Sequence, residues 1–469
     1  MKISCARVIT WNSLGSNHSR ITQENPLGTY NLRAPFARGF FYQKGERMEY
    51  IVKGDIAYNK SLNEFESIHN GYLYVKDGKI VKAMKSLPKE LKKKKLIDYT
   101  GKLILPGMAD LHLHASQFAY KGTLMDVTLL EWLDKYTFPR EAAFKDEKHA
   151  KKAYKVFVDC LKKSFTTKAV IFATIHLEGT YILCELLEKA GIDAYVGIVD
   201  MDRNCPDYIS QTVEGARKDN IELIKRLKDF KHVKPCITPR FTVSCTDPMM
   251  KMLGEVRKEY GVASQSHLDE NEEEIAFVKE LCPDAKSYTD TYDRVGLLEH
   301  SVMAHCIYVT EEEMKTLKEK DVYLVHCPES NTNVTTGGIM PVRKYLDYGM
   351  HVGIGSDVAG GSTLNLFANL KLAIQLSKVI NHGGRNNYKP LNAKEALYIG
   401  TLGGASYFGK AGSFMEGYDA DILVIDDVNG DPSSMKFGIE DRLERLMYNA
   451  SESFLVAKYI DGRKVYERK

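Results

Sequence analysis

Residues 105–114 read Leu105-Pro106-Gly107-Met108-Ala109-Asp110-Leu111-His112-Leu113-His114. The run is largely apolar and ends in two histidines that are separated by one residue. Side chains alternate between the two faces of a β-strand, so both histidines project to the same side. The segment therefore predicts a strand with a pair of imidazoles at its C-terminal end. Because an H-x-H pair arises easily by chance, the rest of the chain decides whether this pair binds a metal.

Seven further apolar runs follow, and longer amphipathic stretches such as residues 311–320 and 364–380 lie between them. Eight strands that alternate with helices over about 300 residues are the pattern of a (β/α)8 TIM barrel, of the α/β class. An open doubly wound sheet would also alternate, but no G-x-G-x-x-G follows the first strand, as a Rossmann fold would require. We expect the barrel strands at residues 107–114, 169–175, 194–199, 235–241, 262–267, 302–305, 322–326 and 352–357.

Short strand patterns also occur at both ends of the chain. Each includes an Asp-Gly between apolar alternations, at Asp77-Gly78 and at Asp461-Gly462, which is typical of a β-hairpin turn. We therefore expect one small β-sandwich domain that is built from both termini. The expected organisation is an unassigned N-terminal extension at 1–36, the composite β domain at 37–105 and 409–469, and the catalytic barrel at 106–408.

Charge and cysteine content exclude several classes of protein. The chain has 469 residues and a net charge of +3, from 65 basic and 62 acidic side chains, so no global field attracts nucleic acid or an anionic membrane. Nine cysteines without a C-x-x-C pair favour a reduced protein over a disulfide framework. No signal peptide and no apolar stretch of about 18 residues is evident. We expect a cytoplasmic protein.

Histidines and an aspartate lie at the C-terminal ends of the expected strands. Five of the 13 histidines are placed there, and in a parallel barrel all these ends meet at one face, where active sites form. Imidazoles with a carboxylate suit zinc and leave one position open for water, whose pKa the metal lowers towards about 7. The residues concerned are His112, His114, His267, His305, His326 and Asp357.

A hydrolytic metal site of this kind also needs a group that carries protons. Glu270 lies three residues after His267, where the chain leaves the fifth expected strand, and we expect it to reach the same cavity. The neighbouring acids Asp269 and 272–274 are better explained as a solvated first turn of a helix, where carboxylates favour the helix dipole.

Several segments are similar to the guanine deaminases of the amidohydrolase superfamily. The resemblance runs from about residue 40 to the C-terminus, and several of its motifs are narrower than the superfamily. Besides residues 105–114, the matching segments are Ala115-Ser116-Gln117, Leu130-Glu131-Trp132-Leu133, Tyr136-Thr137-Phe138-Pro139, Ile237-Thr238-Pro239-Arg240-Phe241, Gln265-Ser266-His267 with Glu270, Met303-Ala304-His305, His326-Cys327-Pro328 and Gly355-Ser356-Asp357-Val358-Ala359-Gly360-Gly361.

The resemblance implies a homodimer that converts guanine and water into xanthine and ammonia, with one zinc ion per chain. Two-metal relatives carry a lysine after the fourth strand, where this chain has Arg240. The implied zinc ligands are His112, His114, His267 and Asp357. The implied catalytic residues are Glu270 as proton shuttle, His305 at the metal-bound water or oxyanion, and Asp357 as a base. The purine would lie against His114, Gln117, Arg240, Phe241, His267, Glu270 and Asp357.

Other functions stay open at this point. A related amidohydrolase could deaminate another purine, a pterin or a triazine, although Gln117, Arg240 and Trp132 lie outside the shared metal set and favour guanine. A non-catalytic scaffold should have lost ligands, which this chain retains. A cytidine-deaminase type site would need P-C-x-x-C after His176-Leu177-Glu178, and none follows. His326 has no assigned role, and His176 lines the mouth or packs structurally.

Overall fold

The computed structural model describes residues 48–333, 338–381, 389–428 and 436–468. The expected N-terminal extension at 1–36, and the first part of the segment 37–105, lie outside the described residues. Among the described residues, no helix is long and apolar enough to span a membrane.

Eight parallel strands close into a barrel, which confirms the predicted TIM-barrel fold. Neighbouring strands pair in chain order from β5 to β13, including β9 with β10 through Ala263 beside Cys236, and β13 pairs with β5 through Ile354 beside Asp110, which closes the ring. A short strand, β8 (Val199–Asp200), pairs with the end of β9. The barrel strands are β5 (Met108–His114), β6 (Thr166–Phe172), β7 (Asp193–Gly197), β9 (Val233–Pro239), β10 (Ala263–Leu268), β11 (Val302–His305), β12 (Tyr323–His326) and β13 (His351–Ile354).

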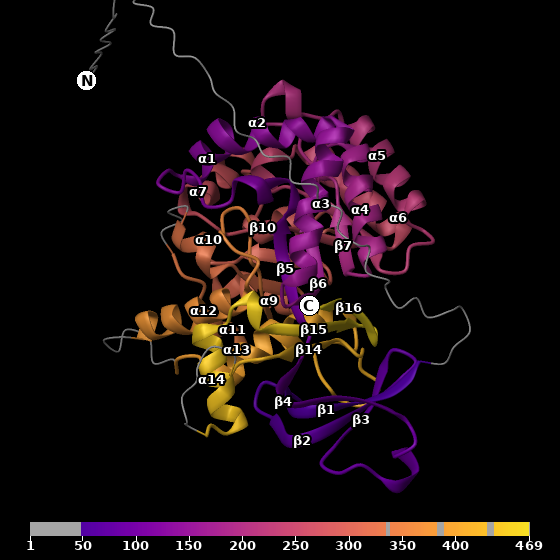
Figure 1. Ribbon diagram of the computed structural model, residues 1–469. Helices are drawn as coiled ribbons and strands as arrows, with labels where there is room; N and C mark the ends of the chain where they lie inside the picture. The colour runs from indigo at the N-terminus through magenta and orange to yellow at the C-terminus, as the bar shows by residue number, and fades with distance from the viewer. Residues whose placement is uncertain (1–47, 334–337, 382–388, 429–435, 469) are drawn as a thin grey trace, which may run out of the picture. The chain divides into compact units, whose positions relative to one another are not determined.

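Helices follow the strands and cover the barrel, as Figure 1 shows for α3, α4, α5 and α6. Local signals set their ends: Thr246 caps α6 by accepting a hydrogen bond from the Met249 N–H, and Gly261 ends it with a φ of 62°. The helices are α1 (Leu129–Trp132), α2 (Phe138–Glu141), α3 (Glu147–Lys163), α4 (Leu177–Ala190), α5 (Val213–Arg226), α6 (Asp247–Tyr260), α7 (Glu272–Leu281), α8 (Tyr288–Asp293), α9 (Glu311–Glu319), α10 (Pro328–Asn333), α11 (Val342–Asp347), α12 (Leu366–Asn381), α13 (Ala393–Tyr398) and α14 (Ile439–Asn449).

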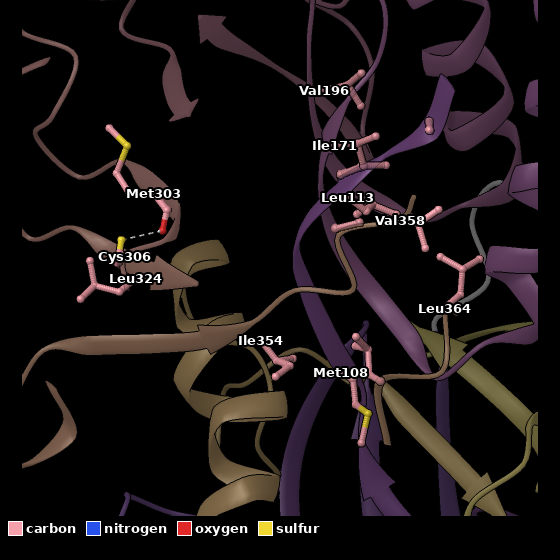
Figure 2. Packing of buried hydrophobic residues seen from close by; sticks show 14 of the residues in the cluster. Met108, Leu113, Ile171, Val196, Met303, Cys306, Leu324, Ile354, Val358 and Leu364 are labelled. Carbon is pink, nitrogen blue, oxygen red and sulfur yellow. Dashed lines mark hydrogen bonds between the residues drawn. The ribbon is translucent and has the colours of Figure 1, made fainter. Parts of the chain in front are cut away.

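The core of the barrel wall is formed by apolar side chains from adjacent strands. Leu113 of β5 pairs with Ile171 of β6, and Ile171 pairs in turn with Val196 of β7. Figure 2 shows these three side chains next to one another, and all three are fully buried. This packing holds the strands in register, and thereby determines where the polar residues at their ends project.

Strands from both ends of the chain form the predicted small β domain, which is confirmed. They pair in the order β16-β15-β14-β4-β1-β2-β3, and Figure 1 shows the N-terminal strands in indigo close to the C-terminal ones in yellow. The β4–β14 pair joins the two parts into one continuous sheet. The strands are β1 (Glu49–Asn59), β2 (Phe65–Lys76), β3 (Lys79–Met84), β4 (Lys95–Pro106), β14 (Ile422–Ile425), β15 (Leu455–Ile460) and β16 (Arg463–Glu467).

Both predicted Asp-Gly turns connect hairpins of this domain. Asp77 and Gly78 have φ values of 49° and 81°, and Asp461 and Gly462 have 48° and 71°. Two positive φ angles in a two-residue loop are the pattern of a type I′ turn, which Asp-Gly tolerates well. The first turn joins β2 to β3 and the second joins β15 to β16.

Candidate active site

Four histidines and one aspartate converge at the carboxyl ends of the barrel strands. His112 and His114 lie on β5, and their Nε2 atoms are 3.2 Å and 3.4 Å from Oδ1 of Asp357. The Nε2 atoms of His267 and His114 are 3.3 Å apart. His305, at the end of β11, places Nε2 3.8 Å from Oδ2 of Asp357. All five side chains are buried, so their polar atoms need a partner inside the protein.

Hydrogen bonds orient the imidazoles towards the centre of this cluster. Nδ1 of His267 lies 2.6 Å from the carbonyl oxygen of Arg240 and donates to it, which leaves the lone pair on Nε2. Nδ1 of His305 lies 2.9 Å from Oδ1 of Asn331, with the same result. Each Nε2 is therefore free to act as a ligand, as in metal sites where a second hydrogen bond sets the tautomer.

The donor set fits a metal ion. Within the described residues, the buried Nε2 atoms of His112 and His305 make no hydrogen bond. Two overlapping triads, His112 with His267 and His305, and His112 with His114 and Asp357, have ligand atoms within 4.8 Å of one another. Buried imidazole nitrogens without hydrogen-bond partners are costly unless a cation pairs with them. The cluster is therefore a potential metal site of the kind expected from the sequence.

Electrostatics keep this donor set in the protonation states that a metal needs. Burial lowers the pKa of His112, and burial with the other imidazoles lowers that of His267, so both are neutral at neutral pH. Burial opposes ionisation of Asp357, but the contacts with His112 and His114 outweigh it and lower the pKa of Asp357 well below its usual value. An ionised carboxylate among neutral imidazoles is the expected donor set for zinc.

Asp357 does not end a strand, in contrast to the sequence prediction that placed it in residues 352–357. β13 ends at Ile354, and Asp357 lies three residues further on, in a loop. Its backbone N–H donates to the carbonyl of His112, and its φ of 42° is in the left-handed region. His305 also has a positive φ, 73°. Such conformations are uncommon outside glycine and cluster where a side chain must be aimed at a site.

Glu270 lies beside the histidine cluster, with Oε2 3.4 Å from Nε2 of His305. Its side chain is buried, and burial together with the carboxylates of Glu274 and Asp357 raises its pKa well above the usual value. Its backbone N–H donates to Glu274, which also accepts from the hydroxyl of Tyr288 at 2.6 Å. A buried carboxyl group with a raised pKa can hold and release a proton near neutral pH.

The expectation of a solvated first helical turn after Glu270 is wrong at two positions. α7 does begin at Glu272, and Glu272 and Glu273 are exposed. Glu274 is fully buried, however, because it closes the capping box of α7 with Asn271. Asp269 is also buried, at 2% exposure.

A cavity with an empty volume of about 410 Å³ opens onto the cluster. The expected purine contacts Gln117, Arg240 and Phe241 line it together with Glu270 and the metal-site residues His114, His267, His305 and Asp357. Trp132, Leu133 and Gly360 also line it and come from segments that the resemblance marked, whereas the lining residues Leu129 and Ser330 lie outside those segments.

Two further polar residues support the cavity, and sequence reasoning missed both. Glu141 accepts hydrogen bonds from Arg240 and Gln117, and Asn331 orients His305. Glu141 lies two residues after the marked segment 136–139, and this proximity is the only signal that could have found it. His326 and His176 are not among the residues that line the described cavity. His326 is buried next to His305, and burial lowers its pKa to about 3.

Comparison with known proteins identifies the family. The chain matches the amidohydrolase family over residues 103–462. The guanine deaminase of Dictyostelium discoideum is 34% identical over 450 residues, which cover 90% of this chain and 99% of that protein. The guanine deaminase of Escherichia coli (strain K12) is 32% identical over 416 residues, which cover 86% and 92%.

A crystal structure of guanine deaminase from C. acetobutylicum, with bound guanine in the active site, has a TM-score of 0.86 to this chain at 42% sequence identity. The match covers 89% of this chain and 100% of that one. The family model matches most of the chain, and the two relatives are more than 30% identical to it along nearly their whole length. The family assignment is therefore unambiguous. This chain belongs to the amidohydrolase family, within the group that these guanine deaminases form.

Proposed function

We propose that this chain is a guanine deaminase, a hydrolase that converts guanine and water into xanthine and ammonia with one zinc ion per chain. The observation that carries the proposal is one cavity in which a potential metal site, a buried proton carrier and two strong N–H donors meet. The relatives named guanine deaminases, which are 32–34% identical over most of this chain, support the same substrate.

The proposed zinc ligands are His112, His114, His267 and Asp357. Their Nε2 and carboxylate atoms face one another at distances of 3.2–3.4 Å. When bound, zinc would supply Lewis acidity and lower the pKa of a water molecule towards about 7. His305 is proposed to contact the reacting water or the developing oxyanion, although its place in one of the potential metal triads also suits a ligand.

Glu270 is the proposed proton carrier. It would take one proton from the attacking water and deliver it to the purine ring, and it would then carry the second proton, from the hydroxyl formed at C2, to the departing amine. Its buried position beside His305 and its raised pKa suit both steps, because the group must be ionised before attack and protonated after it. Asp357 is proposed to assist as a base on the water.

The purine is proposed to lie against Arg240, Gln117 and Phe241. The guanidinium group of Arg240 suits the carbonyl oxygen at C6, since it is a permanently charged donor. Phe241 is 4% exposed and offers an apolar face to the flat base. Hydrolysis then replaces the amine at C2, which is separated by N1 from the carbonyl carbon C6.

Release of ammonia from a purine panel, with and without a strong zinc chelator, tests this proposal. We expect release from guanine that the chelator abolishes and that added zinc restores. Guanine that stays inert while another ring is deaminated would refute the substrate, and chelator-resistant release would refute the metal.

We also propose a cytoplasmic location and a homodimer. A cytoplasmic location fits the eight described cysteines, none of which forms a disulfide. A homodimer is suggested only by the resemblance to the family, and light scattering on the purified protein would test it.

A further inference from the structure

A buried carboxylate lies directly behind two residues of the cavity wall. Glu141 ends α2 and is 2% exposed, and it is not among the residues that line the cavity. Its Oε2 accepts from Nη1 of Arg240 at 2.7 Å, and its Oε1 accepts from Nη2 at 3.4 Å. The same Oε1 accepts from Nε2 of Gln117 at 2.8 Å. One carboxylate therefore connects the two polar side chains that face the proposed purine.

These contacts determine which way the amide of Gln117 points. A carboxylate can only accept a hydrogen bond and a backbone N–H can only donate one, so the amide nitrogen must face Glu141. The amide oxygen accepts from the backbone N–H of Ala359 at 3.2 Å on the other side. Rotation of the amide by 180° would break both hydrogen bonds. The second N–H of Gln117 is thereby the one available for a ligand.

The same carboxylate holds Arg240 in place. The guanidinium of Arg240 and the carboxylate of Glu141 are both buried and form an ion pair. The ring of Phe138, from the same helix as Glu141, has its centroid 5.3 Å from the guanidinium carbon. A buried, paired guanidinium has few other orientations, because each would leave a charge without a partner. The N–H groups of Arg240 that Glu141 does not use therefore remain directed at the cavity that Arg240 lines.

We propose that Glu141 is a positioning residue that makes this wall of the cavity donor-only, so that the site selects a 2-aminopurine with a carbonyl at C6 over one with an amino group there. A carbonyl oxygen at C6 accepts hydrogen bonds, whereas an amino group at C6 would present its own N–H to Arg240 and Gln117. A site built to bond an acceptor rejects an analogue that leaves its buried donors unpaired. This inference rests on the proposed function.

Three substrates with the same amine at C2 test it: guanine, 2,6-diaminopurine and 2-aminopurine. For the wild-type enzyme we expect kcat/KM to favour guanine by at least roughly 100-fold, since charged donors would be left unpaired by the other two. In Glu141→Gln, the new amide can donate as well as accept, so Gln117 and Arg240 are no longer fixed. We expect kcat/KM for guanine to fall roughly 10- to 100-fold, mainly through KM, with much smaller changes for the other two substrates.

Two more variants separate positioning from general damage. Glu141→Asp keeps the carboxylate and should recover part of the selectivity. Glu313→Gln removes another buried carboxylate, which caps α9, and should leave the ratio of guanine to 2,6-diaminopurine unchanged. The metal content of each purified variant is measured alongside and should equal that of the wild type.

The proposal fails if Glu141→Gln leaves the kcat/KM ratios among the three substrates unchanged, for example by lowering activity on all three equally. Glu141 would then be only structural. If Glu141→Gln does not fold, the proposal is tested by the substrate ratios of kcat/KM in the wild type and in Glu141→Asp. A wild type that accepts 2,6-diaminopurine as well as guanine overturns the proposal. An inactive wild type on guanine would instead refute the proposed function, which the wild-type assay shows separately.

Discussion

Replacement of Lys458 by methionine should destabilise the protein without changing its chemistry. Lys458 lies on β15 and is completely buried, and its Nζ donates to three carbonyl oxygens. The acceptors are Leu161 at 2.9 Å and Ser164 at 2.9 Å, around the end of α3, and Thr166 at 2.8 Å, at the start of β6. This ammonium group therefore ties a strand of the β domain to the N-terminal end of the barrel.

The three hydrogen bonds determine how far the free energy of unfolding falls in Lys458→Met. The carbonyl of Leu161 also accepts from the hydroxyl of Ser164 at 2.9 Å, so it keeps a donor in the variant. The carbonyls of Ser164 and Thr166 lose the ammonium, and each buried acceptor that loses its donor costs about 1–3 kcal/mol. Relief from burying a charge offsets part of this sum. We expect the free energy of unfolding to fall by about 2–4 kcal/mol.

Urea unfolding followed by far-UV circular dichroism measures this change. Lys163→Met removes the same charge at an exposed position of α3 and should alter the free energy of unfolding by at most about 0.5 kcal/mol. Turnover by Lys458→Met at 25 °C should equal that of the wild type, because Thr166 begins β6 and the candidate site lies where the strands end. A Lys458→Met protein as stable as the wild type would refute the reasoning and imply that other donors replace the ammonium.

Three further predictions concern the site and the pH dependence of stability. Glu270→Gln should retain its metal and lower kcat by about 10²–10⁴-fold, and substantial turnover would remove Glu270 from its proposed role. Arg240→Ala should raise KM for guanine and also lower the melting temperature, since Glu141 is left buried and unpaired; an unchanged KM would contradict the proposed contact. The hydrogen bond that Nδ1 of His232 donates to Asp193 raises the pKa of His232 above 6.5, so its stabilisation is complete below that pH and is lost as the pH rises through the folded-state pKa. The unfolding free energy of His232→Gln should therefore fall less between about pH 6 and about pH 8 than that of the wild type, and equal slopes would argue against the pair.

The barrel could be predicted because its signal is distributed over the whole chain. Each strand is a short apolar run between amphipathic stretches. Eight such runs alternate with helical stretches along the chain, which is the element order of a closed parallel (β/α)8 sheet. The prediction was less accurate at the ends of the runs. The strand after His326 stops at Ile354, since the backbone then turns through the left-handed conformation of Asp357, and hydrophobicity carries no information about that turn.

The histidine cluster could also be predicted, because two rules act together on it. Alternation along β5 places His112 and His114 on one face, and parallel pairing brings the ends of β10 and β11 to the same edge. Burial of Glu274 could not be predicted in this way. A glutamate in a first helical turn is normally solvated, but Glu274 is enclosed by its capping box and by a hydrogen bond from Tyr288 of the next helix.

Glu141 and Asn331, the two polar residues that sequence reasoning missed, share one physical property: each sets the direction of a hydrogen bond made by a residue of the site. Gln117 can donate or accept, and its sequence position does not say which it does in the cavity. Glu141 decides this, because a carboxylate accepts only, yet it lies 24 residues away along the chain from Gln117 and 99 from Arg240. Asn331 acts on His305 in the same way, over 26 residues. Periodicity can place such side chains near a site, but the polarity that selects a substrate arises from contacts between distant segments, and these exist only in the folded chain.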